Sequence, residues 1–217
     1  MNRKISFAPG EFYHLYNRGV EKRTIFSDEN DWRRFQKTLF FLNNTFSVDW
    51  RIVRDKPFST FKKDSLVAIG AYCLMPNHFH LLVKEVREGG ISMFMEKITT
   101  SHAKYFNKKY ERVGALFQGT FKSEHVASDE YLKYLFAYIH LNPVKLVEPK
   151  WKEMGLKDMM KVKDYLGKFS YSSYADYLGR SGEERLILDK DEFPEYFNRG
   201  YAFQEFVEDW LTFKPNT

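Results

Sequence analysis

Two histidines separated by one residue form the densest group of reactive side chains in the sequence. They are His78 and His80, and they follow the turn signal Pro76-Asn77. In a strand, residues two apart point to the same face about 7 Å apart along the backbone, so both imidazoles can converge on one cation while Phe79 packs on the opposite face. Imidazole is a common metal ligand. Two histidines hydrogen-bonded at the end of a strand give the same pattern, so a metal site requires a third ligand.

A tyrosine and an asparagine in a later helical segment could complete such a site. Tyr138 and Asn142 are four residues apart and therefore neighbours on one helical face, whereas His140 lies about 200° around the helix from Tyr138. Each residue also has an ordinary structural explanation. Asn142 precedes a proline and could simply end the helix, and Tyr138 could belong to the core. Taken together, the histidine pair and the Tyr-x-x-x-Asn spacing predict a metal site beside a nucleophile.

Three runs of sequence carry a resemblance to a known family. They are Phe12-Tyr13-His14-Leu15-Tyr16-Asn17-Arg18-Gly19, Met75-Pro76-Asn77-His78-Phe79-His80-Leu81-Leu82-Val83 and Tyr138-Ile139-His140-Leu141-Asn142-Pro143. The chain resembles the single-tyrosine transposases of bacterial insertion sequences, most closely the REP-associated tyrosine transposases, which belong to the HUH (His-hydrophobic-His) endonuclease superfamily. The similarity extends over about residues 8–148, with a weaker echo at 170–174. Transposases of complete insertion sequences commonly have Gln at the position of Asn142. The REP-associated branch has Asn there, as this chain does.

The resemblance implies a reaction on single-stranded or hairpin DNA. His78, His80 and the Asn142 oxygen would hold a divalent cation, Mg²⁺ or Mn²⁺ in that family, which polarises a phosphate. Tyr138 would attack the phosphorus, giving a 5′-phosphotyrosine and a free 3′-hydroxyl, and a second 3′-hydroxyl could reverse the step. By ligand chemistry alone, two imidazoles and an amide suit Mn²⁺ better than Mg²⁺, and Zn²⁺ is compatible. Transposing relatives commonly act as dimers, whereas the REP-associated branch allows a monomer.

Turn signals and apolar spacing predict the elements that must position these residues. Strands are expected at 12–20, 65–74, 79–83 and 121–126, and helices from an N-cap at 27–30 to residue 42, at 91–110 and at 130–141. Residues 44–64 are expected to form a loop. The order β-α-β-β-α-β-α predicts an α+β fold, a ferredoxin-like antiparallel sheet with two helices on one face and an added helix that bears Tyr138.

Composition limits the class of protein. The chain has 217 residues, a formal charge of +5 and 18% aromatic residues. Its one cysteine, Cys73, excludes an internal disulfide and a cysteine-rich zinc site. The sequence shows no apolar signal region and no run of about 20 apolar residues, so a soluble cytoplasmic protein without membrane association is expected.

The charge is unevenly distributed along the chain. Residues 1–180 carry +10 and residues 181–217 carry −5. The extent of the resemblance, and not the charge, implies a transposase domain at 8–148 and a C-terminal extension at 149–217. In that extension, Phe203, Phe206, Trp210 and Phe213 recur at helical spacing, which favours a helix docked on the body over a helix that binds a partner.

Several basic or polar side chains are candidates for contact with DNA phosphates. They are Arg18, Lys22, Arg23, Lys104, Lys108, Lys109, Arg112, Gln118 and Lys122. A charge run is otherwise only a solvated face. His14, on the first strand, could belong to the core or could support a metal-ligating histidine from behind.

Two other functions fit part of this pattern. One is a non-catalytic nucleic-acid-binding module of the same fold, and the other is a metal-dependent hydrolase that uses water while Tyr138 is structural. The presence of all four residues, His78, His80, Tyr138 and Asn142, favours the enzyme that cleaves and rejoins DNA.

Overall fold

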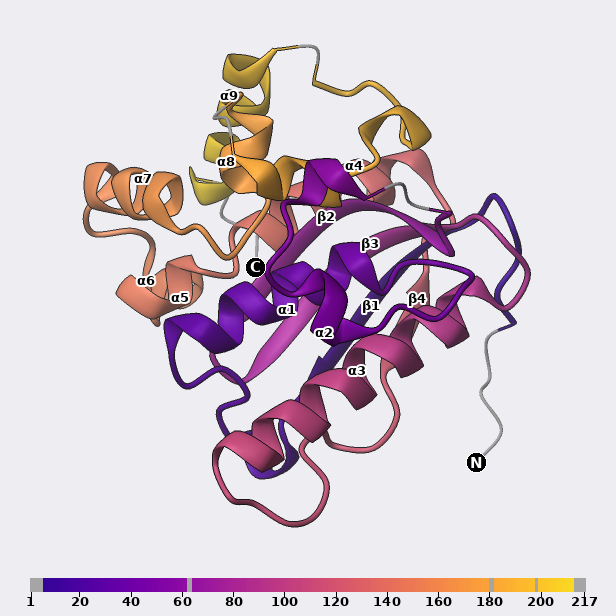
Figure 1. Ribbon diagram of the computed structural model, residues 1–217. Helices are drawn as coiled ribbons and strands as arrows, with labels where there is room; N and C mark the ends of the chain where they lie inside the picture. Colours follow the sequence, from indigo (N-terminus) through magenta and orange to yellow (C-terminus); the bar gives the residue numbers. More distant parts are fainter. Residues whose placement is uncertain (1–5, 62–63, 180–181, 198, 213–217) are drawn as a thin grey trace.

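An antiparallel sheet of four strands forms the centre of the computed structural model, which describes residues 6–61, 64–179, 182–197 and 199–212 (Figure 1). The strands are β1 (Phe12–Arg18), β2 (Val67–Met75), β3 (His78–Glu85) and β4 (Lys122–His125). Their order is β2-β3-β1-β4, and each neighbouring pair is antiparallel. The predicted α+β fold with an antiparallel sheet is confirmed.

The β2–β3 hairpin carries the histidine pair. Its turn falls at Pro76-Asn77, as predicted, so β3 begins at His78. All nine residues of β2 are buried because both faces of the sheet are covered, which explains its continuous apolar sequence. In the pairing register, His80 lies opposite Cys73 on one side and opposite Tyr16 of β1 on the other.

Two long helices cover one face of the sheet: α1 (Glu29–Phe41) and α3 (Gly90–Lys109) (Figure 1). Asp28 caps α1 by accepting from the Asp31 amide, and the Asp31 carboxylate returns the bond. The buried core on this side includes Phe35 of α1, Phe94 of α3 and Phe79 of β3. Phe79 therefore packs away from the histidines that flank it.

The helix that bears the tyrosine covers the opposite face. It is α4 (Asp129–His140), capped by the Ser128 hydroxyl, which accepts from the Tyr131 amide. Its apolar residues share a second core with Ala71 of β2 and Leu82 of β3. The alternation of β3 thus turns Phe79 toward α1 and α3 and His80 toward α4.

Short helices fill the connections and the C-terminal part. They are α2 (Trp50–Val53), α5 (Val144–Val147), α6 (Trp151–Met154), α7 (Met159–Lys168), α8 (Tyr174–Tyr177) and α9 (Gly200–Thr212), with 3-10 turns at 20–22, 58–60, 183–187 and 190–192. The predicted loop at 44–64 therefore contains two short helical turns. The predicted C-terminal helix is α9, and Phe213 lies outside the described residues.

The C-terminal part is joined to the body by backbone hydrogen bonds and by packing. The Leu74 amide donates to the carbonyl of Tyr171 (2.9 Å), and the Ser173 amide donates to that of Tyr72 (3.0 Å), along the outer edge of β2. Phe203 of α9 shares a third core with residues of α4 and α7. The segment that resembles the family only weakly, 170–174, is therefore an edge partner of β2.

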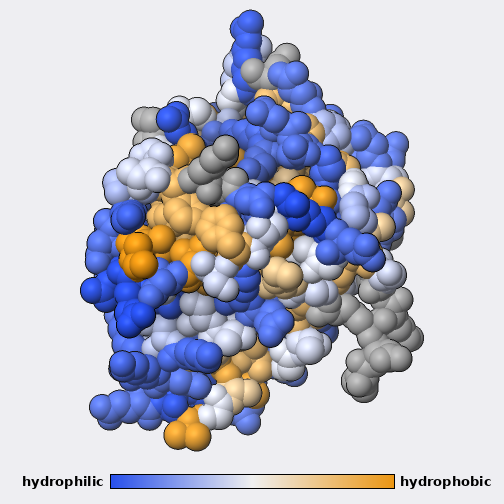
Figure 2. All heavy atoms as spheres, turned by 45° about the vertical axis from the view of Figure 1, so that its right-hand side comes forward, coloured by the Kyte–Doolittle hydropathy of each residue, from blue (hydrophilic) through white to orange (hydrophobic). Residues whose placement is uncertain are grey.

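The surface is mostly hydrophilic on the face shown in Figure 2, where apolar side chains gather in a few separate patches. Across the residues that the structure describes, no helix is both long and apolar enough to cross a membrane.

Two histidines outside the candidate site are completely buried. His102 of α3 approaches the Ile25 carbonyl through Nε2 (2.7 Å), and His140 of α4 approaches the Phe136 carbonyl through Nδ1 and the Ser173 hydroxyl through Nε2, both at 2.7 Å. Burial lowers the pKa of His102 to about 4 and that of His140 to about 3. Both rings are neutral at pH 7.

These buried imidazoles predict acid sensitivity. Their folded-state pKa lies below the usual 6.5, so the unfolded chain binds protons first and stability falls as the pH drops from 6.5 toward 4. Each group should cost about 1.4 kcal/mol per pH unit in that window. Urea unfolding at pH 7, 6 and 5 measures the slope. His102→Gln keeps a donor toward the Ile25 carbonyl. It should reduce the slope of the unfolding free energy against pH by the contribution of about one proton. A pH-independent free energy of unfolding would contradict this prediction.

Candidate active site

Three aromatic side chains, those of His14, His80 and Tyr138, meet on the α4 side of the sheet. The ring centre of His80 lies 5.6 Å from that of Tyr138 and 5.1 Å from that of His14, and His14 lies 5.7 Å from Tyr138. The tyrosine ring is nearly perpendicular to both imidazoles. As predicted from the helical spacing, Tyr138 faces the histidines and His140 points elsewhere, toward Ser173.

His14 and His80 are hydrogen-bonded to each other. Nε2 of His14 lies 2.9 Å from Nδ1 of His80, and Nδ1 of His14 lies 3.8 Å from a carboxylate oxygen of Glu124. With the His14 proton on Nδ1, nearest the carboxylate, Nε2 accepts the proton of His80 Nδ1–H. The Nε2 lone pair of His80 then remains available. His14 is both buried and in contact with His80, so its support of a metal-ligating histidine stays a prediction.

His78 is held in the corresponding way by its neighbour in the turn. Its Nδ1 lies 2.6 Å from Oδ1 of Asn77, while the Asn77 amide nitrogen donates to the Lys22 carbonyl at 3.1 Å. That second bond orients the amide so that its oxygen faces the imidazole. His78 therefore donates from Nδ1 and also keeps its Nε2 lone pair.

Both histidines of the pair are neutral at pH 7. Burial, followed by the charges of Lys145 and Arg18, lowers the pKa of His78 to about 4. Burial and the neighbouring imidazoles lower the pKa of His80 well below its usual value. Neutral imidazole is the form that binds metals.

Asn142 occupies a position with a structural role. It is buried, and its side-chain nitrogen donates to the Tyr138 carbonyl at 2.9 Å, closing the end of α4. No hydrogen bond joins it to either imidazole in the part of the chain that the structure describes. Among those same residues, no group of three or more His, Cys, Asp or Glu side chains could hold a metal. A cation here would depend on the histidine pair and the Asn142 oxygen.

Tyr138 stands at the border between the histidines and a cavity. Burial, then the nearby Tyr134 and Glu124, raises the pKa of its phenol, so it is protonated at pH 7. The Lys152 ammonium lies 5.4 Å from the centre of its ring. The cavity measures about 1180 Å³ and is lined by Tyr134, Ala137, Tyr138, Leu141, Asn142, Lys145, Trp151, Lys152, Glu153, Met154, Gly155, Leu156, Lys157, Met159, Trp210, Leu211 and Thr212.

Some of the predicted DNA contacts lie on the same side as the histidines. Arg18 pairs with His78 across β1 and β3, and Lys122 pairs with Tyr16, the neighbour of His80, so both basic side chains share the histidine face. Arg18 Nε donates to the Gln118 side chain at 2.5 Å. Lys22 and Arg23 follow β1, and the Lys22 carbonyl accepts from Asn77.

The other predicted contacts lie on or after α3, which covers the opposite face. Lys104 and Lys108 are exposed there. The Lys109 ammonium bonds to Asp28 (2.6 Å) and to the fully buried Asp31 (2.7 Å), and Arg112 bonds to Asn107 (2.8 Å). Lys109 therefore ties α3 to the start of α1. These four residues do not adjoin the histidine pair.

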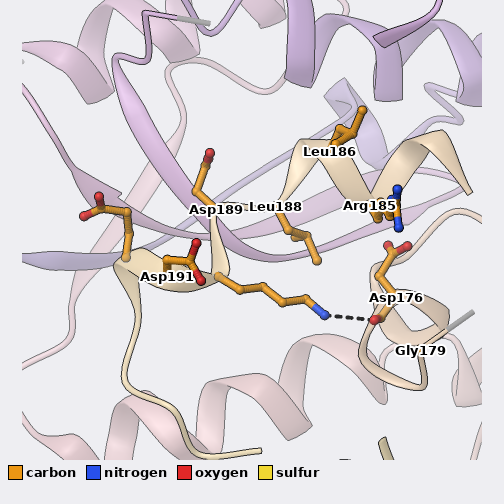
Figure 3. A pocket seen from close by; sticks show the side chains of 9 residues that line it. Asp176, Gly179, Arg185, Leu186, Leu188, Asp189 and Asp191 are labelled. Carbon is orange, nitrogen blue, oxygen red and sulfur yellow. Dashed lines mark hydrogen bonds between the residues drawn. The ribbon is translucent and has the colours of Figure 1, made fainter. Parts of the chain in front are cut away.

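A second cavity, of about 570 Å³, is lined by none of the predicted site residues. It lies along the 3-10 turns near the start of β2, and Figure 3 shows its lining from close by. The Lys190 ammonium donates to the Asp176 carbonyl there at 2.8 Å. Its lining includes Asp176, Asp189, Asp191 and Glu192 against Arg185 and Lys190. An acid-rich lining repels phosphates, so the cavity beside Tyr138 is the better candidate for a nucleic acid.

Several residues of the site were not identified from the sequence. Asn77 could have been, because it adjoins His78 in the same turn. Glu124, which approaches His14, required the register of β4 on β1. Lys145 and Lys152 reach the cavity from segments outside the motifs of the resemblance, and Trp210 was expected only as part of a docked C-terminal helix.

Comparisons with known proteins bear on the family and on the fold. The model of a family described as "Transposase IS200 like" matches residues 41–142. A solved structure described as a REP-associated tyrosine transposase bound to a REP hairpin is similar, with a TM-score of 0.51, 14% identity and coverage of 85% of this chain and 90% of that one. At this identity the likeness concerns the fold.

Two transferases give weaker structural matches. One is a bacterial tRNA(His) guanylyltransferase-like protein in complex with ATP (TM-score 0.41, 11% identity, 77% of this chain and 72% of that one). The other is the tRNA(His) guanylyltransferase of Saccharomyces cerevisiae (TM-score 0.40, 9% identity, 92% and 87%). No curated protein matches the sequence.

Proposed function

We propose, from the match of residues 41–142 to the model of the IS200-like transposase family, that the chain cleaves and rejoins single-stranded DNA with Tyr138 as nucleophile. The observation that carries the proposal is that Tyr138 lies against His80 and His14, which are hydrogen-bonded to each other. These residues come from α4, β1 and β3, so the fold as a whole brings them together.

The histidine pair fits a divalent cation, Mg²⁺ or Mn²⁺. Both imidazoles are held through Nδ1, which leaves Nε2 of each as the ligating atom. Two imidazoles that bind one cation at about 2.1 Å have ring centres about 5 Å apart, and the centres of His78 and His80 lie 5.1 Å apart. The Asn142 oxygen is the proposed third protein ligand. When bound, the cation supplies Lewis-acid polarisation of the phosphate.

The chain's own groups account for the covalent step. The Tyr138 oxygen forms a bond to phosphorus while the bond from phosphorus to the 3′-oxygen of the preceding nucleotide breaks. The phenol's proton passes to solvent, and the departing 3′-oxygen takes one proton from solvent, so no net proton is released. Because burial raises the pKa of Tyr138, positive charge beside the ring is needed to favour the phenolate, and Lys152 provides one such charge.

The proposed substrate is a single strand or a hairpin with unpaired ends. A REP hairpin is the DNA bound to the transposase of the similar solved structure. In this chain, Arg18, Gln118 and Lys122 are the predicted contacts that adjoin the histidine pair, and we retain them as the phosphate-binding set. Since Tyr138 meets His80 of the same chain, a monomer can assemble the site, and a dimer is not required.

We also propose an architecture for the chain. The strand order, the three antiparallel pairings and the placement of α1 and α3 on one face support a ferredoxin-like core with α4 added on the other face. We keep residues 8–148 as the transposase domain and 149–217 as an extension whose described part packs on it.

The test is formation of a covalent adduct. Labelled single-stranded and hairpin oligonucleotides are incubated with the full-length protein and Mn²⁺ or Mg²⁺, then separated in SDS. We expect an SDS-resistant protein–DNA band that EDTA abolishes. Binding without any adduct across a broad set of oligonucleotides would instead favour a non-catalytic DNA-binding module.

Asn77 gives a prediction about metal affinity. Asn77→Ala removes the acceptor for His78 Nδ1, so Mn²⁺ affinity should fall about 10- to 100-fold, measured by calorimetric titration. Asn77→Asp is the matched control, because both variants lose the bond to Lys22 but the carboxylate retains an acceptor oxygen. Equal affinities for the two variants would show that the acceptor is unimportant.

A further inference from the structure

The cavity beside Tyr138 is built mainly from residues that follow the family match. Only Tyr134, Ala137, Tyr138, Leu141 and Asn142 of its lining lie within residues 41–142, and the rest come from α5, α6, the segment after α6, the start of α7 and the C-terminal end of α9. The predicted nucleophile therefore opens onto a space whose walls belong largely to the C-terminal extension.

One wall of this cavity is aromatic and leads to the nucleophile. The ring centre of Trp210 lies 4.8 Å from that of Tyr134, which lies 5.9 Å from that of Tyr138. All three rings are only partly buried. Partly exposed rings along a basic groove are the surfaces on which unpaired bases stack, whatever their sequence.

The charged residues of the lining favour an anion. Lys145, Lys152 and Lys157 face a single acid, Glu153. The Lys152 ammonium lies 5.4 Å from the ring centre of Tyr138 and 5.5 Å from that of Trp151, so this cation stands directly beside the nucleophile. Lys145 is close enough for its charge to act on His78, His80 and Lys152.

The space is large enough for a nucleotide. At about 1180 Å³ it exceeds the usual range of ligand cavities, roughly 300–1,000 Å³. We propose that it holds an unpaired nucleotide next to the scissile phosphate, with the base against Trp210 and Tyr134 and the phosphate at Lys145 and Lys152. This inference rests on the proposed function and specifies how the extension contributes to the same site.

Binding without cleavage tests the inference. The Tyr138→Phe protein is titrated against fluorescein-labelled dT12 by anisotropy, at two salt concentrations. Adding Trp210→Ala should weaken binding about fivefold or more, the loss of one stacked base. Adding Lys152→Ala should weaken binding and reduce the salt slope by about 0.7, the loss of one phosphate contact on a single strand. Affinities within twofold of the parent for both variants would overturn the inference.

Matched controls come from the same two segments. Tyr201→Ala removes an exposed ring from α9, and Lys150→Ala removes a lysine beside α6, and neither residue lines the cavity. Both should bind dT12 within twofold of the parent. A loss as large as that of the cavity variants would mean that general charge or stability, not the cavity, explains the effect.

A crosslinking readout does not depend on any cavity variant folding. dT12 with one 5-iododeoxyuridine is irradiated on the Tyr138→Phe protein, and the crosslinked peptide is identified by mass spectrometry. Trp210 or Tyr134 is expected, and crosslinks confined to other segments would overturn the inference. If the wild-type protein forms the adduct but neither Trp210 nor Tyr134 crosslinks, the proposed function stands and the cavity inference fails. If Trp210 or Tyr134 crosslinks but no adduct forms, the cavity binds DNA and the proposed function fails.

Discussion

Replacing Tyr138 with phenylalanine should abolish the covalent adduct, at least 1000-fold below wild type on the scale of nucleophile deletions. The substitution removes one oxygen and keeps the ring that packs against His14 and His80. The fold and DNA binding should therefore persist. Adduct formation is measured in SDS gels with labelled oligonucleotides and Mn²⁺, and binding by anisotropy.

Tyr201→Phe is the matched control for that experiment. Tyr201 is an exposed tyrosine of α9 that does not line the cavity beside Tyr138. Loss of its hydroxyl should leave the adduct within about threefold of wild type. Cleavage that survives in Tyr138→Phe would refute the nucleophile and revive the hydrolase that uses water.

Replacing His80 with alanine should have the second largest effect. The change removes a proposed ligand and also leaves the buried His14 without its 2.9 Å partner. We expect a loss of adduct of about 1000-fold or more, together with loss of Mn²⁺ binding in calorimetry, because only one imidazole of the pair remains.

His125 provides the control for this substitution. It is an exposed histidine on β4 that bonds to Glu11 at 2.7 Å, and it takes no part in the pair. His125→Ala should retain Mn²⁺ binding and adduct formation within about threefold. If His80→Ala bound Mn²⁺ as the wild type does, the cation would have to lie elsewhere.

The convergence of His80 and Tyr138 could be predicted because it depends on two local periodicities. A period of two turns His80 away from Phe79, and a period of 3.6 separates Tyr138 from His140. The two apolar faces of the elements then determine which sides meet. The same argument could not decide between the two roles of Asn142, since a helix-ending amide and a ligand occupy the same position in the sequence.

The positions of basic residues in the sequence do not indicate on which face of the sheet their side chains lie. Lys104 and Lys109 look like a DNA surface in the sequence, yet α3 covers the face away from the histidines and Lys109 is bonded to Asp31. Conversely, Lys152 and Trp210 border Tyr138 through contacts between distant parts of the chain. Contacts between such distant segments cannot be predicted from a local sequence pattern.

The hydrogen bonds between residues 171–173 and β2 have a consequence for shortened forms of the protein. Without them, a nine-residue strand that is buried along its whole length would present unpaired amides and carbonyls at the edge of the sheet. Such an edge recruits strands from other molecules. A chain ending near residue 148 should therefore aggregate, and its inactivity would say nothing about catalysis. The extension thus covers the edge of β2 with residues 171–173 and lines the cavity with other residues, 151–157, Met159 and 210–212.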